Sequence, residues 1–277
     1  MRELSPSDSG APDARLTRRS LVAAAGILAA VGPAAAGKAL AFSSSKSPKF
    51  DWSGGDKCQT KCGGAICFLR GTRLLTPNGE VAIESLQIGD AVVTEGGAVR
   101  PIRWIGRMTI ARNSDAPWSD DVKPVRVAKG ALGAGSPHRD LYLSRAHMVH
   151  LNGVLMTVGD LINGRTIAAV DVDATQLEYF HVELDTHDVL MAEGAPCESL
   201  LLESGRLSAF DNHEEYLALY GYAPGEAMAP YAPIASFSGG RSELKSRLRS
   251  ALAPVIDIRQ PLDIARDSVE ARALLAA

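Results

Sequence analysis

The stretch of sequence most informative about the fold is Cys67-Phe68-Leu69-Arg70-Gly71-Thr72-Arg73-Leu74-Leu75-Thr76-Pro77-Asn78-Gly79. Its apolar run Leu74-Leu75-Thr76 leads directly into Pro77-Asn78-Gly79, and this residue order strongly favours a turn. Further along, Ala91-Val92-Val93 leads in the same way into the Gly-rich turn at 95–97. Both segments are short apolar runs that end in turn residues, which is typical of β-strands.

The same texture continues to about Leu202. Further strands are expected at Val99–Ile110, Val125–Ala128, Asp140–Leu151, Thr166–Val172 and Tyr179–Met191. Many short strands with Gly-rich turns and little helical periodicity predict an all-β domain, with bounds at residues 67–205. Aromatic residues make up only 5% of the chain, so the core must consist mainly of Val, Leu, Ile and Ala.

A short pattern occurs twice within this region. Asn78-Gly79 is followed by Leu86 and then Gly89-Asp90, and Asn152-Gly153 is followed by Leu161 and then Gly164-Arg165. Each copy places a turn, a short amphipathic segment and a Gly turn before a strand. The pattern predicts two related halves that pack around one site.

The tail at residues 206–277 differs from the β domain. Three prolines interrupt its first part, and Ser242–Ala253 is expected to form an amphipathic helix with Ser242 as N-cap. Leu244, Leu248 and Leu252 share one face of this helix. We expect the tail to support the domain, since no catalytic group of residues is evident in it.

The N-terminus has the layout of a twin-arginine export signal over residues 1–41. Arg18-Arg19 precedes a weakly apolar run, Leu21–Ala36, and small-x-small cleavage sites follow at 34–36 and 39–41. The alternative is an uncleaved anchor, but the run is short for a membrane span of roughly 20 residues. Residues 42–66 form a polar linker. We therefore expect an exported protein, periplasmic or secreted, that meets a membrane only during export.

The four cysteines allow three interpretations from spacing alone. In an exported chain, disulfides Cys58–Cys62 and Cys67–Cys197 are conceivable. A metal site would need Cys58 and Cys62 with His147 or His150, since no second cysteine pair is present. The third interpretation is a nucleophilic Cys67. A formal net charge of −3 gives no reason to expect nucleic-acid binding.

Several ordered blocks closely resemble the Hint (hedgehog/intein) family, in particular its bacterial stand-alone branch. The blocks are Cys67–Gly79 with Ile83–Asp90, Arg100–Gly106, Asp140–His147 and Tyr179–Gly194. The resemblance implies a Hint fold of two pseudo-symmetric halves, in which the opening Cys67 is a self-cleaving nucleophile. Asp140–His147 looks like the family's Thr-x-x-His block, with Ser144 in place of Thr.

The implied reaction is attack of Cys67 on the peptide bond that joins it to Ile66. His147 is the candidate acid that protonates the leaving nitrogen, because a histidine pKa lies near working pH. Ser144 would orient the imidazole or hydrogen-bond the scissile carbonyl. The product is a thioester, and no cofactor or metal is required.

Two further residues of the closing block are candidates for the site. His187 is expected to assist at the thioester or to cap a strand. Asp185, on the same face of an expected strand, either orients an imidazole or is solvated. His150 would face away from His147 if both lay on one strand.

The end of the expected domain differs from that of splicing inteins, which end in His-Asn. Gly194 is followed by Ala195-Pro196-Cys197-Glu198-Ser199, so cleavage or transfer without splicing is expected. The substrate would be the chain's own N-terminal flank, and the acceptor an unknown small-molecule or protein nucleophile. The alternatives are an inactive, disulfide-stabilised Hint-fold module for binding or structure, and a metal-binding protein using Cys58, Cys62 and His147.

Overall fold

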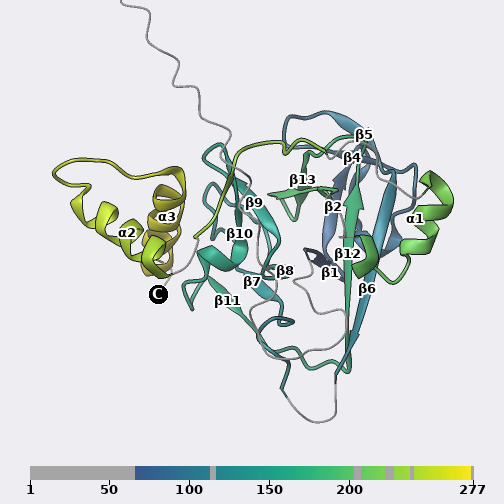
Figure 1. Ribbon diagram of the computed structural model, residues 1–277, viewed down its shortest axis with the longest axis horizontal. Coiled ribbons are helices and arrows are strands. Elements are labelled where there is room, and N and C mark those ends of the chain that lie inside the picture. Colours follow the sequence, from purple (N-terminus) through teal and green to yellow (C-terminus); the bar gives the residue numbers. More distant parts are fainter. Residues whose placement is uncertain (1–65, 113–116, 203–206, 222–227, 238–239, 276–277) are drawn as a thin grey trace, which may run out of the picture. The chain divides into compact units, whose positions relative to one another are not determined.

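The computed structural model describes residues 66–112, 117–202, 207–221, 228–237 and 240–275 (Figure 1). Regular structure between residues 66 and 202 consists of β-strands and two short 3-10 helices, so the expected all-β class is confirmed. The expected export signal, Cys58 and Cys62 lie outside the described residues.

The first sheet contains six strands in the order β11-β7-β8-β1-β12-β6, all antiparallel to their neighbours. Their bounds are β1 Phe68–Leu69, β6 Trp104–Ala111, β7 Val125–Val127, β8 Leu141–Leu143, β11 Ile167–Ala169 and β12 Gln176–Glu183. The short β1 is central: Phe68 pairs with Leu143 on one side and Phe180 on the other. This register places Cys67 beside the end of β8.

The second sheet contains seven strands in the order β15-β10-β9-β14-β13-β2-β3. Their bounds are β2 Arg73–Thr76, β3 Gly79–Ala82, β9 Met148–Leu151, β10 Val154–Thr157, β13 Val189–Ala192, β14 Ala195–Glu198 and β15 Ile234–Ala235. A two-stranded sheet pairs β4 Ala91–Val93 with β5 Val99–Pro101. Because β14 pairs with β9, Cys197 lies opposite Val149 and Glu198 lies near the start of β9.

The repeat expected from the sequence corresponds to two similar series of elements. Hairpin β2–β3 turns at Pro77-Asn78, and hairpin β9–β10 turns at Asn152-Gly153. Asn152 and Gly153 both have positive φ. A 3-10 helix follows each hairpin, η1 Ile83–Ser85 and η2 Val158–Leu161. A glycine with positive φ then precedes the next strand in each half, at 89 and at 164.

Three of the expected strands are interrupted, which is a correction to the sequence interpretation. Val99–Ile110 divides into β5 and β6, Asp140–Leu151 into β8 and β9, and Tyr179–Met191 into β12 and β13. In the second and third cases the chain crosses from the first sheet to the second. An alternating apolar pattern continues across such a crossing because both sides remain buried. Four of the five candidate site residues, Ser144, His147, Asp185 and His187, lie in these two crossings and not within strands.

The tail contains η3 Leu207–Ala209, α1 His213–Tyr220, α2 Gly240–Leu252 and α3 Pro261–Leu275. The expected helix is α2, which begins two residues earlier than predicted. Its apolar face does not support the domain, because Leu244, Leu248 and Leu252 are 61%, 55% and 52% exposed. Support comes instead from α3, whose buried apolar residues Leu262, Ala265 and Val269 join the main core.

In the part of the chain that the structure describes, no helix combines the length and the apolar character needed to cross a membrane.

Candidate active site

The peptide bond between Ile66 and Cys67 is buried. Cys67 directly precedes the central strand β1 and is 0% exposed, and Ile66 is 8% exposed. The Cys67 side chain packs with a small apolar cluster that includes Trp104, Tyr179 and Leu200. The expected nucleophile therefore lies in an apolar environment and not at an open surface.

Ser144 contacts Cys67 through two hydrogen bonds. The Cys67 backbone N–H donates to Ser144 Oγ over 2.8 Å, and the Ser144 backbone N–H donates to the Cys67 carbonyl over 2.9 Å. Because this Cys67 nitrogen belongs to the Ile66–Cys67 bond, the Ser144 hydroxyl lies at the nitrogen of that bond. The expected contact with the scissile carbonyl does not occur among the hydrogen bonds of the described residues.

His147 closes the turn that begins at Ser144, since its backbone N–H donates to the Ser144 carbonyl over 3.1 Å. His147 precedes β9, whereas His150 lies within it, so the two histidines do not share a strand as the sequence interpretation assumed. Its ring is 0% exposed and lies 4.3 Å from the Phe68 ring and 5.1 Å from the His181 ring, between centroids. Within the described residues neither ring nitrogen of His147 has a hydrogen-bond partner.

This environment determines the protonation state of His147. Burial, followed by the charges that His181 and His187 would carry, lowers the pKa of His147 well below its usual value. The imidazole is therefore neutral at neutral pH, whereas the sequence interpretation assumed a pKa near working pH. A neutral imidazole still offers one N–H donor and one lone pair.

His187 forms a hydrogen bond at one ring nitrogen and lies near a carboxylate with the other. Its Nδ1 accepts the backbone N–H of Tyr231 over 2.9 Å, and its Nε2 lies 3.5 Å from Glu198 Oε2, with both side chains fully buried. Accepting at Nδ1 leaves the proton of a neutral ring on Nε2, which then points to Glu198. His187 lies in the loop between β12 and β13, two residues before β13 begins.

Asp185 lies in the same loop but points away from the imidazoles. Its side chain is 48% exposed, and Oδ2 lies 3.7 Å from Arg100 Nη1. The expectation that it shares a strand face with His187 is wrong, because residues 184–188 are not a strand. His150, which we did not place in the site, pairs with Glu95 over 2.5 Å.

The two described cysteines are both free and fully buried, so a Cys67–Cys197 disulfide is not formed. Burial, and to a smaller extent the charge of Glu198, raises the pKa of both thiols above the usual range. Cys67 is thus a protonated thiol that must lose its proton during any attack.

Glu198 and His181 belong to this region but were missed as site residues. Glu198 is 0% exposed, and its Oε1 accepts the backbone N–H of Met148, the residue after His147, over 2.8 Å. Its position within the apolar run 195–202 is a signal that the sequence offered, because a carboxylate inside a buried run requires partners. His181 faces His147 from β12 and gave no comparable signal.

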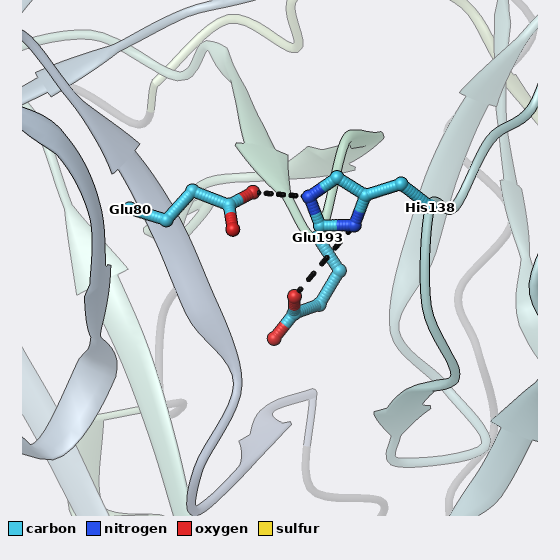
Figure 2. Close-up of side chains that lie close together, drawn as sticks. All are labelled: Glu80, His138 and Glu193. Atoms are coloured by element: carbon cyan, nitrogen blue, oxygen red, sulfur yellow. Dashed lines mark hydrogen bonds and ion pairs between the residues drawn. The ribbon is translucent and has the colours of Figure 1, made fainter.

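A second cluster, Glu80, His138 and Glu193, has donor atoms close enough together to hold a metal ion (Figure 2). His138 presents Nε2 to Glu80 at 2.7 Å and Nδ1 towards Glu193 at 4.0 Å. Arg139 Nε also lies 2.8 Å from Glu193 Oε2. A metal would bind one imidazole nitrogen and would compete with this guanidinium, so the geometry favours an ion-pair network that joins β3 to the β13–β14 turn.

The chain was compared with known proteins. A family model described as Hint domain matches residues 66–204, which is half of the chain. No curated protein matches.

Solved structures also show similarity. A bacterial intein-like domain from Clostridium thermocellum has 15% identity over 49% of this chain and 99% of that chain, with a TM-score of 0.34. The MchDnaB-1 intein has 16% identity over 48% of this chain and 99% of that chain, also with a TM-score of 0.34. A DnaB intein from Synechocystis sp. PCC 6803 has 9% identity over 49% and 99%, with a TM-score of 0.32.

Proposed function

The chain belongs to the Hint domain family, whose members are self-processing domains, and from this premise we propose that it cleaves its own chain at the Ile66–Cys67 bond. The reaction is an N–S acyl shift followed by cleavage or transfer of the thioester, without splicing. The observation that carries the proposal is the contact between Ser144 Oγ and the nitrogen of this buried bond, in the same turn that holds His147.

The first step forms a bond between Cys67 Sγ and the Ile66 carbonyl carbon and breaks the bond from that carbon to the Cys67 nitrogen. The thiol proton finishes on this nitrogen. Attack by the adjacent side chain passes through a five-membered ring, and positioning of this kind lowers a barrier by up to roughly 7–11 kcal/mol. No external reactant is needed for the shift.

His147 supplies proton transfer in this scheme. The lone pair of its neutral imidazole accepts the thiol proton, and its N–H protonates the leaving nitrogen, so the ring begins and ends neutral. Ser144 holds the nitrogen through the hydrogen bond at 2.8 Å and orients it as it becomes an amine. The charge of Glu198 disfavours the free thiolate, so the thiol proton leaves only as the new bond forms.

Cleavage without splicing is supported by the sequence after Gly194. Residues 195–202 contain no asparagine that could cyclise and release the second flank. The nearest, Asn212, is used structurally: its side chain donates to the Ile105 carbonyl and accepts the Arg107 backbone N–H.

We further propose that residues 1–41 direct export and that the segment ending at Ile66 is released, or is attached through the thioester to an external nucleophile. The polar composition of residues 42–65 suits a flank that leaves the domain without disturbing its core. The acceptor is water, a small molecule or a protein nucleophile.

The test is the intact mass of the purified chain with and without dithiothreitol or hydroxylamine. We expect loss of the segment that ends at Ile66, accelerated by both reagents, and no loss in Cys67→Ala. Cys197→Ala is the matched control, because it removes the other buried free thiol and should still cleave. Equal cleavage in Cys67→Ala would overturn the proposal.

A second candidate function is an inactive Hint-fold module for binding or structure. It is favoured by the raised pKa of the buried Cys67 thiol, which leaves little thiolate at neutral pH. An unchanged mass under every condition would support this candidate.

A further inference from the structure

Helix α2 exposes its apolar face. Leu244, Leu248 and Leu252 are spaced four residues apart, so they form one ridge along the helix, and all three are more than half exposed. The segment directly after the helix exposes three more apolar side chains, Val255, Ile256 and Ile258, at 83%, 64% and 52%. We call these six residues the α2 ridge.

The opposite face of α2 is polar and buried against α3. Ser246 is 0% exposed, donates its hydroxyl hydrogen to Asp263 and accepts from Arg266 Nη1 over 2.7 Å. Arg249 also pairs with Asp263, with its Nε 2.6 Å from Oδ2. Because α2 is attached through hydrogen bonds and ion pairs, the α2 ridge plays no part in holding the helix.

Basic side chains accompany the ridge. Helix α2 contains four basic residues and one acidic residue, Glu243. The basic residues are Arg241, Lys245, Arg247 and Arg249. Arg241 and Lys245 are exposed and lie seven residues before Leu248 and Leu252, which places each of them on the side of the ridge. Arg247 pairs with Glu243 and Arg249 with Asp263, whereas Arg241 and Lys245 form no ion pair within the described residues, so the ridge has two available cations beside it.

We propose that the α2 ridge docks on an anionic phospholipid surface. A helix with leucines on one face, cations beside them and low overall hydrophobicity is the kind that lies in a membrane interface. The arginine and lysine stems extend along the apolar surface while their charges reach the headgroups. Two copies of α2 packed ridge to ridge would bring like charges together, which disfavours a second copy as the occupant.

Figure 1 shows α2 separated from the strands by α3, on which it packs. Docking through the ridge would therefore leave the hydrogen bonds between Ser144 and Cys67 untouched. The proposal is independent of the self-cleavage reaction, and either can fail without the other.

The test uses the full chain with vesicles of phosphatidylcholine alone or mixed with phosphatidylglycerol. Amide hydrogen exchange over residues 240–258 reports docking locally, so binding by any other segment does not disguise the result. We expect anionic vesicles to slow exchange in this segment, neutral vesicles to have little effect, and added salt to weaken the protection.

Two sets of variants separate the apolar and charged contributions. Leu244→Gln with Leu248→Gln should reduce vesicle affinity by at least about tenfold. Arg241→Gln with Lys245→Gln should reduce it by roughly thirtyfold, at about fivefold for each cation. The matched controls are Leu219→Gln, at a half-exposed leucine of α1, and Lys129→Gln, which should leave the affinity unchanged.

Glutamine has nearly the helix propensity of leucine, so the ridge variants should remain folded, and circular dichroism checks this. Unchanged exchange over 240–258 with anionic vesicles would overturn the proposal. Concentration-dependent dimerisation that the ridge variants abolish, without vesicle protection, would overturn it in favour of a second copy.

Discussion

Two regions of this molecule bury polar side chains in opposite ways. Between α2 and α3, Ser246 donates to Asp263 and accepts from Arg266, and Asp263 also pairs with Arg249. At the candidate active site, His147 is equally buried, but its ring nitrogens have no partner among the described residues. Buried polar groups are normally paired because an unpaired one costs about 1–3 kcal/mol. The paired group holds structure, and the unpaired imidazole is what a proton-transfer residue requires.

We expect the largest effect from His147→Leu, which removes the unpaired imidazole. Cleavage should slow by about 100- to 10,000-fold, because the proton-transfer group is lost. The free energy of unfolding should not fall and should rise by about 1 kcal/mol, since an unsatisfied polar ring is replaced by an apolar side chain. Mass spectrometry over time and urea unfolding measure the two effects. A destabilised but active variant would contradict the assigned role.

Asp263→Ala should give the opposite result at the α2–α3 contact. Removing the shared carboxylate leaves Arg249 and the Ser246 hydroxyl without their main acceptor, at a cost of about 3 kcal/mol to the packing of the tail. Cleavage should proceed at the original rate. Hydrogen exchange of α2 and α3 measures the loss, with Asp267→Ala, a more exposed carboxylate, as the milder control. Equal stability of Asp263→Ala and the unmodified chain would be evidence against the paired network.

Ser144→Ala should slow cleavage by roughly ten- to a hundredfold, because the nitrogen of the scissile bond loses its hydrogen-bond acceptor. Ser144→Thr keeps the hydroxyl and should keep most of the rate. The rates follow from intact mass at several times. If both variants cleaved equally slowly, the effect would arise from packing and not from the hydroxyl.

The pH dependence of stability should show the smallest effect. The folded pKa of His147 is lowered, so the unfolded chain binds more protons as the pH falls below the unfolded value of about 6.5. The contribution from neutral His147 is therefore complete above that pH and is lost at about 1.4 kcal/mol per pH unit below it. The free energy of unfolding, measured with urea between pH 5 and 7.5, should depend less steeply on pH in His147→Leu than in the unmodified chain. If the free energy of unfolding depended on pH identically in His147→Leu and the unmodified chain, a neutral buried His147 ring would be contradicted.

The sequence was sufficient for the fold class, the repeated hairpins and the closeness of Cys67 and Ser144. Turn residues such as Asn78-Gly79 and Asn152-Gly153 have a local physical cause, so they were predictable. The ordered blocks also carried the family, which the family match confirms.

The sequence was not sufficient for the features that depend on where the chain changes sheets. Asp185 and His187 alternate as on a strand, but the chain bends between β12 and β13, and only His187 turns inward. The apolar run around Glu198 indicated a buried carboxylate, but its partner at the start of β9 followed only from the pairing of β14 with β9. The leucines of α2 have the period of a buried face, yet α3 offers that helix a polar surface instead.

The central claim is that Cys67 Sγ takes the acyl group from its own nitrogen. The most direct measurement is tandem mass spectrometry of the peptide released by hydroxylamine. The account predicts a C-terminal hydroxamate on Ile66 in the unmodified chain and no such peptide from Cys67→Ala. A released peptide that ends at another residue, or one that forms equally in Cys67→Ala, would contradict it.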